Sequence, residues 1–135
     1  MGYRSDVRIL VNKTGLELLK QKTVEYAKEY CKLNSDKEWA KAYCEHSILE
    51  DWKVIATNYS DEIILETNYI KWDTYYTDVQ WIYNALHDLT EAHLPYQVIN
   101  IGEDGAYEDA KNYEEYDDIE PLKTEMFVEI NFNFQ

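Results

Sequence analysis

Hydrophobic and polar residues alternate near both ends of the chain, with the spacing that is typical of β-strands. Residues 126–134 place Met, Val, Ile and Phe at every second position, between polar residues over most of the segment. Because side chains two positions apart share one face of a strand, this segment predicts a strand with one apolar and one polar face. The same period occurs near the N-terminus, where Val7, Ile9 and Val11 alternate with Asp6, Arg8 and Leu10.

Three segments instead repeat their hydrophobic residues every three or four positions, as amphipathic helices do. The first two are preceded by the spacing of a capping box, with Thr14 and Ser35 as the expected N-caps. The third begins at residues 77–80 and is expected to end before Pro95, since proline disfavours helical backbone in the residue before it. Its stripe contains Val79, Ile82, Tyr83, Leu86, Leu89, Thr90 and His93.

Between these helices lie two β-rich runs, residues 52–58 and 62–69, which predict a hairpin, and a further strand at 96–101. The predicted order matches the split β-α-β, or ferredoxin-like, arrangement with one extra helix and one terminal strand. We therefore expect one α+β domain over residues 1–135. It should be a two-layer sandwich, with a mostly antiparallel sheet of about five strands, helices on one face and an acidic loop insertion at about 103–120.

The charge changes this picture more than the composition does. The chain of 135 residues has a formal net charge of −14, but residues 1–50 are nearly neutral and residues 51–135 hold 19 acidic and four basic residues. This charge argues against direct binding of the protein to nucleic acid or to anionic membranes, because both kinds of binding need a basic surface. Residues 103–120 hold nine acids beside Lys111, and we expect this segment to be solvated and non-core. It is either a solubilising loop or a sticky anionic surface.

Aromatic residues form a second dense feature, with six Tyr and Trp residues between positions 69 and 83. Trp72 and its neighbours either fill the core below the third helix or anchor a protein partner, since Tyr and Trp dominate interface hot spots.

The sequence contains no pattern that indicates catalysis or a cofactor. His46, His87 and His93 are not placed beside a credible nucleophile, and the four glycines do not form a phosphate-binding loop. His93 is expected at the end of the third helix, where a cation favours the helix dipole. The acids lack EF-hand spacing, and Cys31 and Cys44 are expected to be free thiols of a reduced, cytoplasmic protein, although a disulfide between them is open. We expect no catalytic residue, metal or cofactor.

Two regions resemble a group of small phage and prophage proteins. The chain opens with Met-Gly-Tyr-Arg-Ser-Asp-Val, and the group begins M-G-Y-R-S-[D/E]-V. Residues 70–80, 95–104 and 117–120 are similar to its I-K-W-Y…D/E-V, Y-x-F-I-x-I-G-E and D-D-I-E stretches, with Asp73 in place of the Tyr. The resemblance implies a phage context and makes inhibitors of bacterial defence systems, such as anti-CRISPR proteins, the comparison class.

The leading hypothesis is a non-enzymatic inhibitor that occupies the basic groove of a host nucleic-acid-binding defence protein as a nucleic-acid mimic. The alternative is a module that binds or sequesters a nucleotide on a polar sheet face near Arg4, Arg8, Asn131 and Asn133. A homodimer through an exposed edge strand at 126–134 is also expected to be feasible. The expected partner-binding residues are Glu103, Asp104, Glu108, Asp109, Tyr113, Glu114, Glu115, Tyr116, Asp117, Asp118, Trp72, Tyr75 and Tyr76.

Overall fold

The sheet and its connections follow the predicted α+β arrangement. A computed structural model describes residues 3–114, 117–124 and 126. The strands are β1 (Ser5–Asn12), β2 (Lys53–Ala56), β3 (Glu62–Ile70), β4 (Tyr96–Gly102) and β5 (Tyr107–Lys111). All neighbouring strands are antiparallel, and the order is β2-β3-β1-β4-β5. The first four strands reproduce the split β-α-β pattern, which confirms the predicted fold class.

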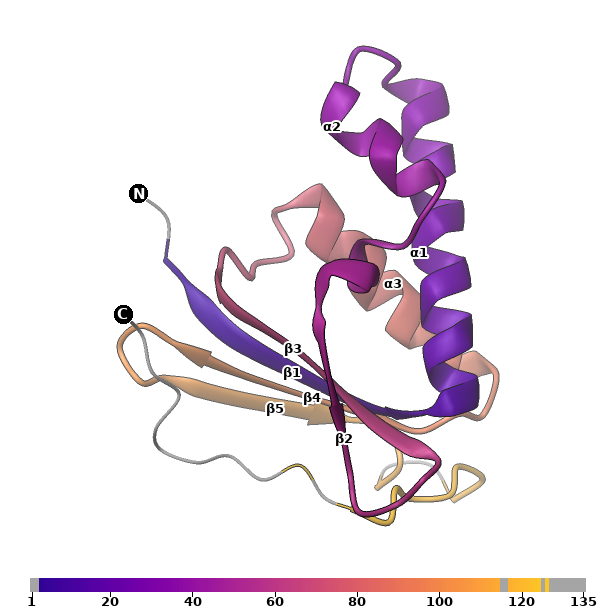
Figure 1. The fold of residues 1–135 in the computed structure, drawn as a ribbon, viewed down its shortest axis with the longest axis vertical. Coiled ribbons are helices and arrows are strands. Elements are labelled where there is room, and N and C mark those ends of the chain that lie inside the picture. Colours follow the sequence, from indigo (N-terminus) through magenta and orange to yellow (C-terminus); the bar gives the residue numbers. More distant parts are fainter. Residues whose placement is uncertain (1–2, 115–116, 125, 127–135) are drawn as a thin grey trace.

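The helices lie on one face of the sheet (Figure 1). Two long helices, α1 (Lys13–Leu33) and α3 (Thr77–Glu91), pack against each other there. Between α1 and β2 the chain forms α2 (Glu38–Lys41) and two 3-10 turns, η1 (Ala42–Cys44) and η2 (Ile48–Asp51). We call residues 38–51 the arm, because α2 and η1 cover the far end of α1, away from the sheet (Figure 1).

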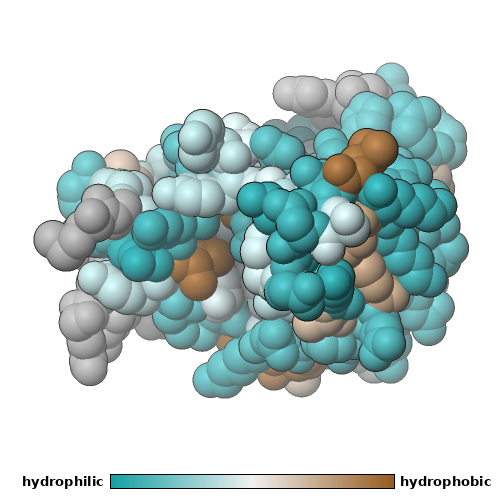
Figure 2. Space-filling model, turned by 90° about the horizontal axis from the view of Figure 1, so that it is seen from above, coloured by the Kyte–Doolittle hydropathy of each residue, from teal (hydrophilic) through white to brown (hydrophobic). Residues whose placement is uncertain are grey.

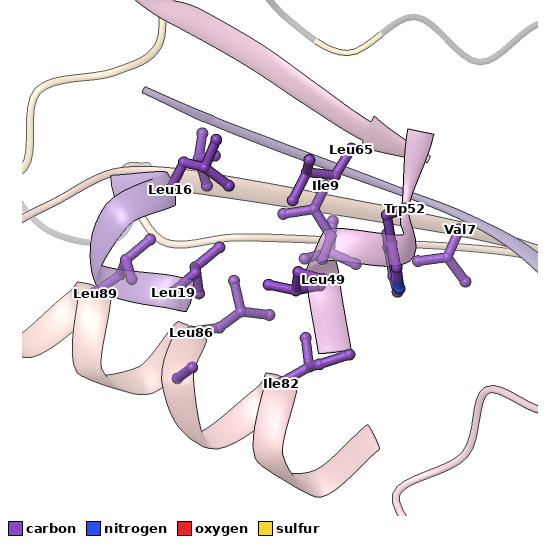
Figure 3. Close-up of a cluster of buried hydrophobic side chains, with 13 residues drawn as sticks. Val7, Ile9, Leu16, Leu19, Leu49, Trp52, Leu65, Ile82, Leu86 and Leu89 are labelled. Carbon is purple, nitrogen blue, oxygen red and sulfur yellow. The ribbon is translucent and has the colours of Figure 1, made fainter. Parts of the chain in front are cut away.

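The main core fills the space between the sheet and these helices (Figure 3). Alternate β1 residues Val7, Ile9 and Val11, none of them exposed, meet Leu19 of α1 and Leu86 of α3. This is the face that the strand alternation predicts. Apolar side chains buried in this way contribute about 1.5–3 kcal/mol each, so this layer holds the helices on the sheet.

The opposite face of the sheet is covered, where the sequence predicted a solvated one. Leu10, which alternates onto this face, is fully buried. It packs in a second core with Ile99 of β4 and with three residues from the segment after β5, Ile119, Leu122 and Met126. That segment runs along the face opposite the helices (Figure 1). The acidic region 103–120 was predicted to be solvated and non-core, and its described acids are exposed. The prediction fails for Tyr113 and Ile119, which lie among these acids and pack in the second core.

The predicted acidic loop insertion at 103–120 is also partly wrong. Residues 107–111 form β5, which pairs with β4 from Ile101↔Tyr107 to Gln97↔Lys111. The spacing of Tyr107, Ala110 and Tyr113 is also compatible with a short helix, but backbone pairing with β4 overrides this local spacing. The predicted strand at 126–134, and the dimer edge assigned to it, lie almost entirely outside the described residues.

The helix ends differ from the predicted capping boxes. Asn12, rather than Thr14, caps α1: its Oδ1 accepts a hydrogen bond from the Gly15 backbone N–H at 2.7 Å. Asn is at least as good an N-cap as Thr, so the helix begins earlier than predicted. Ser35 caps nothing, since α2 begins after Lys37 without a side-chain cap.

Helix α3 ends before Pro95, as predicted, but it stops at Glu91, so His93 does not lie in its last turn. His93 lies beyond the helix with a φ of 58°, its N–H bonds Thr90 O, and the N–H of Leu94 bonds Leu89 O at 2.9 Å. These bonds form a Schellman motif with a histidine in the position that usually holds glycine.

Asp6 in β1 is a buried carboxylate with an unequal environment at its two oxygens. It is 1% exposed, and its Oδ1 accepts a hydrogen bond from the Tyr69 N–H at 2.8 Å. Its Oδ2 has no hydrogen-bond partner within the part of the chain that the structure describes. Burial raises the pKa of Asp6, and the neighbouring Glu66 carboxylate raises it further.

We expect Asp6→Asn to stabilise the protein at pH 7 by on the order of 1 kcal/mol, because it keeps an acceptor for Tyr69 and removes a buried charge. A folded-state pKa above 3.8 means that the wild type loses stability as the pH rises through that pKa. The gain should therefore be smaller at pH 4 than at pH 7 in urea unfolding measured at both pH values. A gain that shrinks toward pH 7 would contradict this account.

Candidate functional site

The exposed acids between residues 103 and 118 lie in the turn before β5, on β5 and in the segment after it, and we call this set the acidic edge. It consists of seven described residues, all exposed to solvent: Glu103, Asp104, Glu108, Asp109, Glu114, Asp117 and Asp118. Among the described strands β5 is the last of the sheet, so no described strand pairs with its outer side. The predicted Glu115 and Tyr116 lie outside the described residues. Glu108 and Asp109 therefore lie on a paired strand, although the sequence predicted a loop at these positions.

Two of these acids also fasten the N-terminal segment to the turn between β4 and β5. Glu103 Oε1 accepts a hydrogen bond from the Arg4 N–H at 2.6 Å, and Asp104 accepts one from the Tyr3 hydroxyl. The Tyr3 hydrogen bond lowers the pKa of Asp104, and the same bond raises the pKa of Tyr3. The lowered pKa of Asp104 favours its charged form, and both carboxylates are fixed in place with one oxygen each already hydrogen-bonded.

The remaining acids differ in how far they are already neutralised. Asp118 lies 2.6 Å from Nδ1 of His93, and Glu114 lies 2.8 Å from Nζ of Lys111. Asp109 accepts a bond from the Gln97 amide at 3.2 Å. Glu108 and Asp117 make no ion pair or hydrogen bond to any described side chain. The edge is consequently anionic in net terms, even though Glu114 faces Lys111 and Asp118 faces His93.

Tyr113 was predicted to contact a partner, and the structure places it in the second core. It is 8% exposed and packs with Leu10 and Ile99, and its hydroxyl bonds Gln97 Oε1 at 3.4 Å. It is therefore not available to a partner. Its spacing from Ile119 and Leu122 carries the missed signal, an apolar series interspersed in the acidic run.

The three aromatic residues predicted beside the acids lie in the connection between β3 and α3. Trp72 is half-buried against the main core and donates from Nε1 to the Tyr83 hydroxyl at 2.9 Å. Tyr76 is half-buried, whereas Tyr75 is 84% exposed. No described contact joins these residues to the acidic edge. The predicted partner-binding residues thus lie on two separate parts of the molecule. Trp72 packs against the core, which was one of the two alternatives for the aromatic residues.

A cavity of about 380 Å³ opens between the arm, the β3–α3 connection and the ends of β1 and β3. Its aromatic walls include Trp52 and Trp72, whose rings meet edge to face at 5.8 Å. Arg4, Lys71, Asp51 and Asp78 also line it. Its size lies in the range of small-molecule sites, which is about 300–1,000 Å³.

The polar sheet face proposed for a nucleotide does not form as predicted. Arg8 lies on the face opposite the helices, with its Nε 2.6 Å from Glu66, while Arg4 lines the cavity on the helix side. Asn131 and Asn133 lie outside the described residues. The register shift between Ser5 and Val7 explains why Arg4 and Arg8 separate despite their even spacing.

The other histidines and the two cysteines contact neighbouring residues of the described structure. His87 lies 3.4 Å from Glu91, His46 packs against Tyr43, and neither is hydrogen-bonded to a described serine or cysteine. Cys31 and Cys44 are free, as expected, with their sulfurs 3.2 Å apart, and burial raises the pKa of Cys44. Over residues 3–114, 117–124 and 126, no group of three or more potential metal ligands occurs.

Hydrophobic atoms reach the upper face of the molecule only as separate patches among hydrophilic ones (Figure 2). None of the described helices combines the length and apolar character needed to cross a bilayer. No protein-family model, curated protein or solved structure matches the chain. Function must therefore be argued from the acidic edge and the cavity.

Proposed function

We propose that the protein is a non-enzymatic inhibitor whose acidic edge occupies the basic nucleic-acid-binding groove of a host defence protein. One observation carries the proposal: seven exposed carboxylates lie on β5 or in the segments next to it, with Lys111 paired to Glu114 and His93 beside Asp118. An anionic surface on a rigid element attracts a basic groove over long range and competes with nucleic acid for it.

Two further features support this function. A β-strand advances about 3.3 Å per residue, so the consecutive acids Glu108 and Asp109 of β5 have a spacing close to the roughly 3.4 Å per phosphate of one DNA strand. The resemblance of the opening residues to phage and prophage proteins supports a defence protein, such as a CRISPR effector, as the partner.

The test is displacement of fluorescent DNA from a panel of purified CRISPR effectors, followed by fluorescence anisotropy at increasing salt. We expect the wild type to displace DNA from at least one effector. The displacement should weaken as salt is raised from about 0.05 to about 0.5 M, because the electrostatic screening length becomes shorter. A variant in which four acids of the edge are replaced by neutral amides should displace DNA at least about tenfold less well at low salt. Its substitutions are Glu108→Gln, Asp109→Asn, Asp117→Asn and Asp118→Asn.

The matched control removes the same charge from the nearly neutral half of the chain. Its substitutions are Glu17→Gln, Glu29→Gln, Asp36→Asn and Glu45→Gln, all at exposed positions. This control should retain wild-type displacement if the position of the charge matters. Equal loss in both variants would show that only net charge acts, and no displacement by the wild type from any effector would contradict the proposal for this partner class.

A further inference from the structure

The cavity described above has two adjacent cations at one side. Arg4 directly precedes Ser5, Lys71 directly follows Ile70, and Ser5 and Ile70 are register partners in β1 and β3. The two cations therefore emerge side by side at the ends of neighbouring strands. Neither lies within 4 Å of a described carboxylate; each instead faces a tyrosine ring, Arg4 over Tyr69 at 5.5 Å and Lys71 over Tyr76 at 5.9 Å. In a chain with 27 acids, such a pair is a built anion site.

Two carboxylates reach the cavity from the helical layer. Asp51 is the last residue of η2, and Asp78 lies in the first turn of α3. Both act on the same hydroxyl: burial raises the pKa of Tyr43, and the charges of Asp51 and Asp78 raise it further. The cavity is therefore bipolar, with cations at the sheet ends and acceptors on the helical side.

The walls between these charges are apolar and aromatic. Trp52 of the segment after η2 and Trp72 after β3 line the cavity together with Ile48 and Ile82. Trp72 is held in place by its bond to Tyr83 and by ring contact at 5.3 Å. Such walls favour a planar ring, since aromatic rings gain stacking and edge contacts in addition to burial.

We propose that this cavity binds a nucleoside monophosphate with an amino-bearing base. The phosphate dianion lies between Arg4 and Lys71, the base packs against the tryptophans, and its exocyclic N–H donors face Asp51 and Asp78. A dianion matches two adjacent cations better than the single carboxylate of an amino acid does. The site shares no residue with the acidic edge, so it is independent of the inhibitor function proposed above.

The test uses AMP, adenosine, IMP and tryptophan as probes, with binding followed by isothermal titration calorimetry and by quenching of tryptophan fluorescence. We expect AMP to bind with a Kd below about 1 mM and adenosine to bind at least about tenfold more weakly. IMP, which lacks the amino group, and tryptophan, which has one carboxylate, should also bind more weakly than AMP. The variant Arg4→Gln with Lys71→Gln should weaken AMP binding at least about tenfold.

The control is Lys28→Gln with Lys32→Gln, which changes net charge equally at exposed positions of α1 and should leave AMP binding within about twofold of wild type. A second variant, Asp51→Asn, keeps both cations and should reduce the preference for AMP over IMP. Equal affinity for AMP and adenosine would overturn the phosphate position. Absence of AMP binding, or tighter binding of tryptophan, would overturn the nucleotide assignment, and neither result would bear on DNA displacement by the acidic edge.

Discussion

Replacing Leu10 with alanine is expected to lower the free energy of unfolding by about 2–5 kcal/mol. Leu10 is fully buried, and it joins Ile99 of β4 to Tyr113, Ile119 and Leu122 of the segment that follows β5. Removing three side-chain carbons there costs their transfer free energy and leaves a cavity, since neighbours relax only partly. A solvated position would lose much less, so this substitution tests whether the second face of the sheet is covered.

Urea unfolding followed by circular dichroism measures the effect. Ile9→Ala, one residue away on the helix side and also fully buried, should lose a comparable amount. Val54→Ala on β2 is the surface control, because Val54 is 58% exposed and should change stability by less than about 0.5 kcal/mol. A loss at Leu10 as small as that at Val54 would mean that the segment after β5 does not pack on the sheet in solution.

Trp81→Ala is expected to have the second large effect, a loss of about 3–5 kcal/mol. Trp81 of α3 is 4% exposed and forms the centre of an aromatic cluster. Its ring stacks on Trp39 at 5.6 Å and meets Tyr30 and Tyr43 nearly edge to face at 5.8 and 6.1 Å. These contacts join α3 to α1 and to the arm, so the loss should be concentrated where the arm docks.

The measurement combines denaturant unfolding with amide hydrogen exchange of residues 38–51. Exchange in residues 38–46 should accelerate more than exchange in β1, because this part of the arm loses its contacts with Trp81, whereas Leu49 stays buried in the main core. AMP binding should weaken as well, since Tyr43 and Asp51 of the arm line the cavity. Trp39→Ala, at a residue that is 46% exposed, should cost less than half as much. Unchanged exchange in the arm of the Trp81 variant would contradict this role.

The acidic edge and the cavity lie on different parts of the molecule and share no residue. The acidic edge lies along β5, one margin of the sheet, and the cavity lies between the arm and the ends of β1 and β3. A protein of net charge −14 repels an anionic ligand, and Arg4 and Lys71, which have no described carboxylate within 4 Å, would offset that repulsion at the cavity.

Much of the fold follows from local sequence patterns. The period of two in β1, the β-rich run of β3 and the stripe of α3 predict elements that the structure contains, because each depends on residues within one element. Their order is sufficient for the split β-α-β arrangement, since few ways exist of covering one face of a sheet with two crossover helices. The uneven distribution of charge, dense after residue 102, is likewise a property of the chain alone.

Other features depend on contacts between residues far apart in the chain. Whether residues 107–111 form a helix, loop or strand was decided by the backbone groups that β4 left unpaired, and no local pattern reports them. Tyr113, Ile119 and Leu122 pack inward because the far face of β1 and β4 offers apolar surface at Leu10 and Ile99. Arg4 and Lys71 line one cavity because β1 pairs with β3. The cavity therefore exists only in the folded chain, whereas the uneven distribution of charge is already present in the sequence.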